Sequence, residues 1–202
     1  TITNSGKIYS DDQRAINFFS DATTTTVTNN SAGHIYNSNT NETIKLDTSS
    51  TLTNSGKIEN KNSADNNSIL LIGDNNTVTL KDSGLVIGTI GASSGTSGNK
   101  LKIQHGIGQS YYYKTSGDFD LEDLDGNQIV KGSAGSVGQG GSETLDELLS
   151  YKTINLRNFF DSYTNSNFYN NEGGWGEVYA SNLNRDQNAS SKGLEFELIN
   201  IG

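Results

Sequence analysis

The stretch TLTNSGKI at residues 51–58 decides the fold, because it repeats almost unchanged the stretch TITNSGKI at residues 1–8. A weaker copy, TVTNNS, begins at Thr26, and a fourth, TVTL, begins at Thr77. The copies start at residues 1, 26, 51 and 77, which gives steps of 25, 25 and 26 residues. A fixed period of this length is typical of a solenoid, in which each repeat is one structural unit.

Each repeat has the pattern of one coil built from short strands. The Thr-apolar-Thr alternation indicates a strand with one buried side chain, and the Asn-Ser-Gly that follows favours a turn. A second apolar patch follows in three of the repeats, at residues 16–19, 44–46 and 69–72. One unit cannot bury its apolar side alone, so several coils must stack. The sequence therefore predicts an all-β fold, a right-handed parallel β-helix over residues 1–100.

Stacked coils place equivalent residues in columns along the solenoid. One predicted column is apolar and internal, and it contains Ile2, Val27, Leu52 and Val78. A second column lies at a bend, where side-chain amides hydrogen-bond from coil to coil, and it contains Asn4, Asn29 and Asn54.

The composition supports this fold class and argues against several others. Only 31% of residues are hydrophobic and 18% are charged, and the chain contains no Pro and no Cys. Short strands with few inward residues suit that apolar content better than amphipathic helices do. The net charge of -9, without any basic cluster, argues against nucleic acid as a partner. The absence of Cys excludes disulfides and thiolate metal sites.

After residue 100 the coil pattern changes. Short apolar segments predict a β-hairpin cap over residues 101–131, with one hairpin turning at Asp125-Gly126 between residues 119–121 and 128–130. Residues 132–141 are rich in Gly and Ser and predict a linker. Thr144 and Glu147 form a capping box, and the apolar spacing that follows predicts one amphipathic helix over residues 142–165.

These features resemble the passenger domain of bacterial autotransporters, whose β-helices contain coils of the TNSGxI type. In that family a folding-promoting cap precedes a helix that threads a translocator barrel, and the barrel opens with a Trp-x-Glu strand and an Arg-Asp turn. The matching positions here are Trp175, Glu177, Arg185 and Asp186. The resemblance implies that residues 166–202 begin this barrel, with a second strand at residues 194–201. An amphipathic helix docked on the side of the solenoid remains the alternative for residues 142–165.

The resemblance also implies a location at the cell surface or outer membrane, or outside the cell, of a Gram-negative bacterium. The implied function is adhesion, self-association or a structural stalk, and the implied partners are surface glycans, further copies and the translocator barrel. The sequence has no apolar run near the roughly 20 residues of a transmembrane helix, and two strands cannot close a barrel. We therefore expect no membrane span by this chain alone.

The alternative function is a carbohydrate-active β-helix enzyme, a polysaccharide hydrolase or lyase, which needs carboxylates aligned in a cleft. The charged cluster within the coils is Asp11-Asp12-Gln13-Arg14, and we interpret it as a solvated turn. We expect no enzyme activity, no catalytic residues and no cofactor.

Four aspartates suggest a calcium site, because Ca²⁺ prefers several convergent carboxylates; they are Asp118, Asp120, Asp123 and Asp125. The calcium-loop signature is incomplete, however, and the Asp125-Gly126 turn offers a competing explanation. His34 and His105 have no neighbouring His or Cys, so a zinc site is not expected. We interpret His34 as a solvated turn residue. The sequence thus predicts no metal, with calcium as the weaker alternative.

Overall fold

A computed structural model gives the structure of residues 1–19, 24–137, 149–150, 152–154, 157, 178–185 and 194–201. The chain divides into two compact units, Thr1–Val137 and Gly138–Gly202. The first unit holds the coils and their cap.

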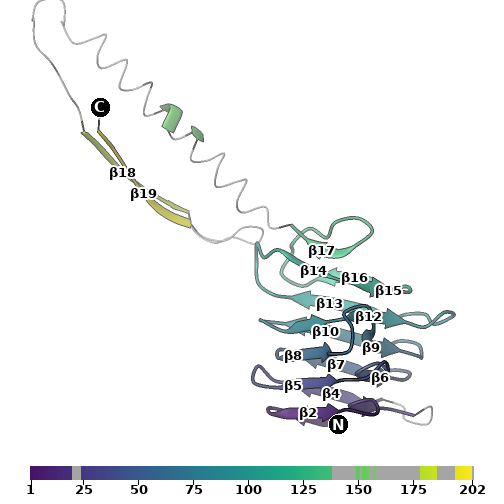
Figure 1. Ribbon diagram of the computed structural model, residues 1–202. Helices are drawn as coiled ribbons and strands as arrows, with labels where there is room; N and C mark the ends of the chain where they lie inside the picture. Colours follow the sequence, from purple (N-terminus) through teal and green to yellow (C-terminus); the bar gives the residue numbers. More distant parts are fainter. Residues whose placement is uncertain are drawn as a thin grey trace, which may run out of the picture. The chain divides into compact units, whose positions relative to one another are not determined.

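The first unit is a parallel β-solenoid, as the sequence predicts (Figure 1). Successive coils add strands in turn to three parallel sheets, named A, B and C. Sheet A has six strands: β1 (Ile2–Asn4), β4 (Thr26–Asn29), β7 (Thr51–Asn54), β10 (Thr77–Lys81), β13 (Lys100–Gln104) and β16 (Asp120–Asp123). Sheet B has four: β2 (Lys7–Ser10), β5 (His34–Asn37), β8 (Lys57–Asn60) and β11 (Leu85–Ile87). Sheet C has five: β3 (Ile16–Asn17), β6 (Ile44–Leu46), β9 (Asn67–Leu71), β12 (Thr89–Ala92) and β15 (Thr115–Ser116).

The predicted apolar column is confirmed. Ile2 pairs with Val27, Val27 with Leu52, and Leu52 with Val78 in the registers of sheet A. The column continues to Leu101, and all of its members except Ile2 are fully buried. Burial of one such side chain contributes about 1.5–3 kcal/mol. Columns of stacked apolar side chains therefore form a narrow core, which is enough to stabilise a chain of low apolar content.

The predicted asparagine ladder is also confirmed. Asn4 Nδ2 donates to Asn29 Oδ1 at 2.8 Å, and Asn29 Nδ2 donates to Asn54 Oδ1 at 2.7 Å. All three side chains are buried. The ladder ends at Asn54, whose amide donates to the carbonyl of Leu85, because Leu80 takes the equivalent place in the next coil.

Two further polar columns fill the other bends, and the repeat pattern did not predict them. At one bend the amides of Asn37 and Asn60 both donate to the carbonyl of Asn41. At the other, Asn76 Oδ1 accepts the backbone N–H of Ser50, and Asn99 Oδ1 accepts the N–H of Asn76. Buried polar groups stabilise a fold only when they are hydrogen-bonded, and these columns meet that requirement along the solenoid.

The parallel stack extends beyond residue 100, which corrects the predicted hairpin. β16 pairs in parallel with β13, so the segment around Phe119–Leu121 continues sheet A. Residues 128–130 do not pair with it; Ile129 instead bridges Ser136 in antiparallel fashion. Gly126 does adopt a left-handed conformation (φ +80°), so the predicted turn at Asp125-Gly126 forms. The residues after it do not pair back with residues 119–121. Leu121 lies in register with Leu101, and this alignment with the apolar column favours the parallel pairing.

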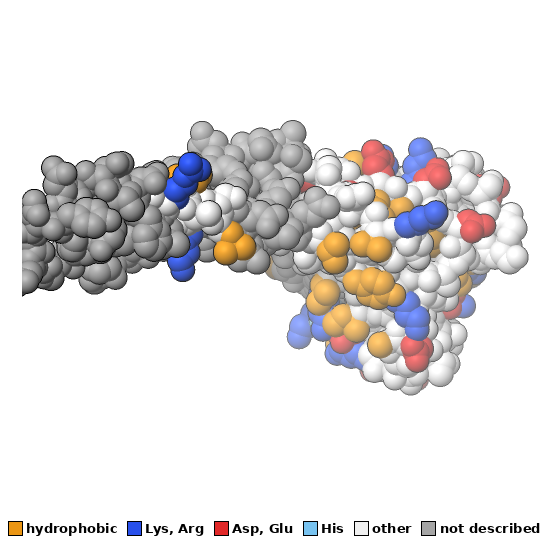
Figure 2. All heavy atoms as spheres, turned by 90° about the horizontal axis from the view of Figure 1, so that it is seen from above, with side chains coloured by type: hydrophobic (Ala, Val, Ile, Leu, Met, Phe, Trp, Pro, Cys, Tyr) orange, Lys and Arg blue, Asp and Glu red, His pale blue; other side chains and the backbone are white. Residues whose placement is uncertain are grey.

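The cap is an antiparallel pair formed by β14 (Tyr111–Tyr113) and β17 (Ala134–Ser136). β17 lies inside the predicted linker, so that prediction is wrong for these three residues; residues 138–141 lie outside the described part of the chain. Figure 2, which looks onto the capped end, shows hydrophobic side chains gathered there among scattered charges. The exposed apolar side chains of the cap and of the segments next to it are Tyr112, Leu124, Val130 and Val137.

The second unit holds helical residues and an antiparallel hairpin. Residues 149–150, 152–154 and 157 are helical, in agreement with the helix predicted for residues 142–165, whose other positions lie outside the described residues. The hairpin consists of β18 (Val178–Arg185) and β19 (Leu194–Ile201), and β19 has the bounds predicted for the second strand. Arg185 ends β18, whereas Trp175, Glu177 and Asp186 lie outside the described residues. Among the described residues, no helix is both long and apolar enough to cross a membrane.

Candidate functional site

The outer side of sheet B carries the most varied side chains of the solenoid. In a strand, alternate residues point to opposite faces, so β5 and β8 bury Ile35 and Ile58, β2 partly buries Ile8, and all three strands project the neighbouring residues outward. In-register pairing aligns these neighbours in two rows. Together with Lys61, which follows β8, the outward side chains form the tyrosine face: Lys7, Tyr9, His34, Tyr36, Lys57, Glu59 and Lys61.

Two tyrosines give the face its name. The rings of Tyr9 and Tyr36 stack with centroids 5.3 Å apart and an interplanar angle of 11°. Lys61 Nζ lies 3.5 Å from the centroid of the Tyr36 ring, a cation–π contact. His34 packs on the same ring at a centroid distance of 4.6 Å. Tyr36 is thus held on several sides, while Tyr9 remains 59% exposed.

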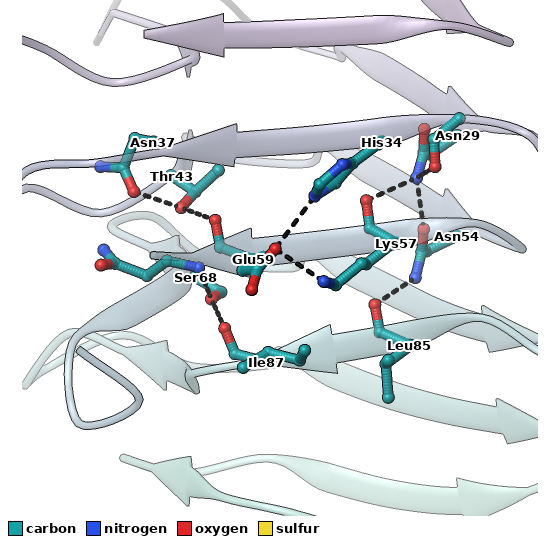
Figure 3. Close-up of polar contacts among 12 residues, drawn as sticks. Asn29, His34, Asn37, Thr43, Asn54, Lys57, Glu59, Ser68, Leu85 and Ile87 are labelled. Carbon is teal, nitrogen blue, oxygen red and sulfur yellow. Dashed lines mark hydrogen bonds and ion pairs between the residues drawn. The ribbon is translucent and has the colours of Figure 1, made fainter. Parts of the chain in front are cut away.

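Glu59 is held by two neighbours on this face. Figure 3 shows its carboxylate between His34 and Lys57, with His34 Nε2 at 3.1 Å and Lys57 Nζ at 2.7 Å from the same oxygen. Partial burial raises the pKa of Glu59, but hydrogen bonds and charge attraction from Lys57 and His34 outweigh it and leave the pKa below its ordinary value. Glu59 is therefore an ionised pairing partner and a poor proton donor near neutral pH.

The tyrosine face is locally basic on an acidic protein. Its charged side chains are three lysines and one glutamate, which gives +3 - 1 = +2 with His34 neutral, whereas the whole chain carries -9. Charges of one sign gathered on one surface attract ligands of the opposite sign at long range. The face can thus bind an anionic ligand electrostatically.

The structure revises two predictions made for polar residues of the coils. His34 begins β5 and contacts Glu59, so its interpretation as a solvated turn residue is wrong. The repeat places it at the position of Lys7 and Lys57, a signal that the sequence did contain. Asp11 and Asp12 are exposed, as predicted for a solvated turn. Arg14 differs, since its Nε donates to Glu42 Oε1 at 2.7 Å.

His105 connects the last coils to the cap. Its Nδ1 lies 2.6 Å from the carbonyl oxygen of Asp82, and its Nε2 lies 2.7 Å from the hydroxyl of Tyr113. Tyr113 in turn donates to the carbonyl of Gly84 at 3.0 Å. His105, Tyr113 and the two backbone carbonyls form a hydrogen-bonded cluster, in which both ring nitrogens of His105 have a protein partner.

The four aspartates of the calcium alternative do not converge. Asp118 and Asp120 are exposed. Asp123 Oδ1 accepts the backbone N–H groups of Asp125 and Asn127 at 2.9 and 3.0 Å, while Asp123 Oδ2 accepts the hydroxyl of Tyr111 at 2.6 Å. Asp125 Oδ2 accepts the N–H of Gly106 at 2.6 Å. These carboxylates order the cap loops, and the described residues contain no group of three or more acidic, His or Cys side chains arranged to hold a metal.

No protein-family model, no curated protein and no solved structure matches this chain. The fold itself therefore defines the class of protein: a parallel β-solenoid with an antiparallel cap.

Proposed function

We propose that this chain is a segment of an autotransporter passenger at the surface of a Gram-negative bacterium, where it acts in adhesion by binding acidic glycans through the tyrosine face. The order of elements supports the autotransporter part: solenoid coils, a cap, helical residues and then a hairpin. The TNSG turns and the strand at residues 194–201 carry the same resemblance.

The observation that carries the adhesive role is the contrast between the outer faces of sheets A and B along the first four coils. Sheet A projects threonines in four successive coils, Thr3, Thr28, Thr53 and Thr79. Sheet B projects lysines, tyrosines and a histidine with a net charge of +2. A protein that serves only as a stalk needs no more than a polar, uncharged surface such as the threonine row of sheet A. A basic, partly aromatic face suits contact with a carboxylated polysaccharide, since many weak contacts along a polymer add up to firm attachment.

The carbohydrate-active enzyme is the less favoured alternative. Glycoside hydrolysis commonly uses two carboxyl groups facing one sugar, one of them protonated near neutral pH. Glu59 is the one carboxylate on the tyrosine face, and its lowered pKa is unsuited to an acid catalyst. This arrangement favours binding over hydrolysis at that face.

A bead-retention assay tests the proposal. Beads coated with the purified chain are passed over surfaces of polygalacturonate, an acidic polysaccharide, or dextran, an uncharged one. We expect retention on polygalacturonate alone, falling as salt rises because screening weakens exposed charge pairs. Equal retention on both surfaces, or on neither, contradicts the proposal. Sedimentation of the chain without glycan separates adhesion from self-association, since self-association as the main activity predicts concentration-dependent oligomers.

A further inference from the structure

A groove of about 520 Å³ lies where sheet B ends and the cap begins. Among the described strands, sheet B stops at β11, whereas sheets A and C continue to β16 and β15. After β13 the chain leaves the coil path and returns as β14, which pairs with β17. The groove is therefore bounded by β11 on one side and by the tyrosines of β14 on the other. We propose that it binds one uncharged saccharide unit, at a site separate from the tyrosine face.

The aromatic wall of the groove is fixed in place. Tyr111 donates its hydroxyl to Asp123 at 2.6 Å, and Tyr113 donates to Gly84 at 3.0 Å. Burial raises the pKa of Tyr113 to about 12, and burial together with the bond to Asp123 raises that of Tyr111. Both phenols thus stay neutral near physiological pH. Tethered aromatic rings offer a rigid apolar surface at little entropic cost, which suits the C–H face of a sugar ring.

The groove also contains polar groups available to a ligand. Leu85 N–H donates to the carbonyl oxygen of Gly56, the residue before β8, at 2.8 Å, so the alternation of a parallel strand turns the N–H and C=O of Val86 toward the groove. Asp82 and Gln109 line it as well; Asp82 Oδ2 already accepts the Ser55 hydroxyl at 3.3 Å, and a carboxylate has further lone pairs with which to accept from a ligand. Within the described part of the chain, the Gln109 side chain makes no hydrogen bond to protein. A carboxylate acceptor and an amide that both donates and accepts match the hydroxyls of a sugar.

Charge and size narrow the ligand class. The lining carries one carboxylate, Asp82, and no lysine or arginine, so an acidic sugar would be repelled where an uncharged one is not. The volume lies within the roughly 300–1,000 Å³ of small-molecule sites. An extended peptide is less suited, because Gly84 O already accepts Tyr113 and too few edge groups remain for the three or more residues of a typical strand.

The test is a titration of the ¹⁵N-labelled chain with maltose, cellobiose, lactose and N,N′-diacetylchitobiose, followed by amide chemical shifts. We expect at least one disaccharide to shift the amides of Val86 and of residues 109–111. Gln109→Ala should weaken that binding about five- to tenfold, as loss of one hydrogen bond predicts. Gln13→Ala, which alters an exposed glutamine in the turn after β2, is the matched control and should leave it unchanged.

A second variant distinguishes loss of binding from loss of folding. Asp82 has a positive φ of 54°, which Asn tolerates, so Asp82→Asn preserves the turn while removing the charge and should also weaken binding. The proposal is overturned if none of the four sugars shifts these amides, or if both groove variants bind as the unaltered chain does. Shifts confined to Tyr9 and Tyr36 overturn it too, while leaving the adhesive role of the tyrosine face intact.

Discussion

The side-chain amide of Asn29 donates to Oδ1 of Asn54 across 2.7 Å, and both side chains are fully buried. The same Asn29 amide lies 3.2 Å from the carbonyl oxygens of Gly33 and Lys57, so one side chain ties together two successive coils. The ladder is thus the polar counterpart of the apolar column beside it.

Removal of one amide from the ladder should destabilise the solenoid strongly. Asn29→Ala removes the donor to the buried Oδ1 of Asn54 and one acceptor of the Asn4 amide, and each unsatisfied buried group costs about 1–3 kcal/mol. We expect a loss of roughly 2–4 kcal/mol in the free energy of unfolding, measured by urea denaturation. Asn30→Ala, which removes a bond to Ser5 at the exposed turn, should change it by less than about 0.5 kcal/mol. Equal effects of the two variants would contradict the ladder.

The turn glycines differ in the space around them. A Cβ at Gly33 would lie 2.8 Å from the carbonyl oxygen of Asn4 and would also collide with the Asn29 side chain, whereas a Cβ at Gly6 would meet nothing within 4 Å. We expect Gly33→Ala to lower the midpoint of thermal unfolding by several degrees, and Gly6→Ala to leave it nearly unchanged. A similar drop for both would show that backbone freedom, rather than close coil-to-coil approach, selects glycine here.

The lowered pKa of Glu59 predicts a dependence of stability on pH. A carboxyl whose pKa falls on folding stabilises the protein above its unfolded pKa, and the contribution disappears as pH falls through the folded pKa. We expect Glu59→Gln to be less stable than the unaltered chain at neutral pH, by about 0.2–1 kcal/mol for a partly exposed pair. The difference should vanish well below the ordinary value of 4.5. Urea titrations from neutral pH to about pH 3 measure it, and a constant difference would refute the assignment.

Asp123 orders the cap through hydrogen bonds. Its carboxylate accepts the N–H of Asp125, the N–H of Asn127 and the hydroxyl of Tyr111. Asp123→Ala should therefore destabilise the cap by about 2–3 kcal/mol through lost bonds to a charged acceptor. Addition of calcium or of a chelator should leave the unfolding midpoint of the unaltered chain unchanged. A rise with calcium that Asp123→Ala abolishes would restore the calcium alternative.

The sequence could predict the parts of the fold that repeat strictly. Asn4, Asn29 and Asn54 are separated by steps of 25 residues, so alignment alone placed them in one ladder. The sequence does not indicate the column of Ser50, Asn76 and Asn99, because its steps are 26 and 23 residues and its residue type changes. The bonding differs as well: side-chain amides donate to one another in the first column, whereas backbone N–H groups of Ser50 and Asn76 donate to side-chain oxygens in the second.

The cap was harder to predict because the repeat loses its turn motif after β12. β13 starts 23 residues after β10, and no Asn-Ser-Gly turn follows it. The sequence therefore favours local pairing into hairpins over continued stacking of coils. Ala134–Ser136 has no bulky β-branched residue, and its strand exists because β14 offers an open edge. The tyrosine face could not be predicted for another reason. Tyr9 and Tyr36 lie far apart in sequence, and only the register of sheet B brings their rings into a stack.

The most direct test of the central claim changes the charge of the tyrosine face alone. Lys7→Gln/Lys61→Gln removes two lysines of this face, and Lys81→Gln/Lys100→Gln removes two exposed lysines of sheet A strands. Both variants shift the net charge equally, from -9 to -9 - 2 = -11. In the polygalacturonate assay we predict that the first variant loses most of its retention while the second keeps it. Equal retention by the two variants would contradict adhesion through this face.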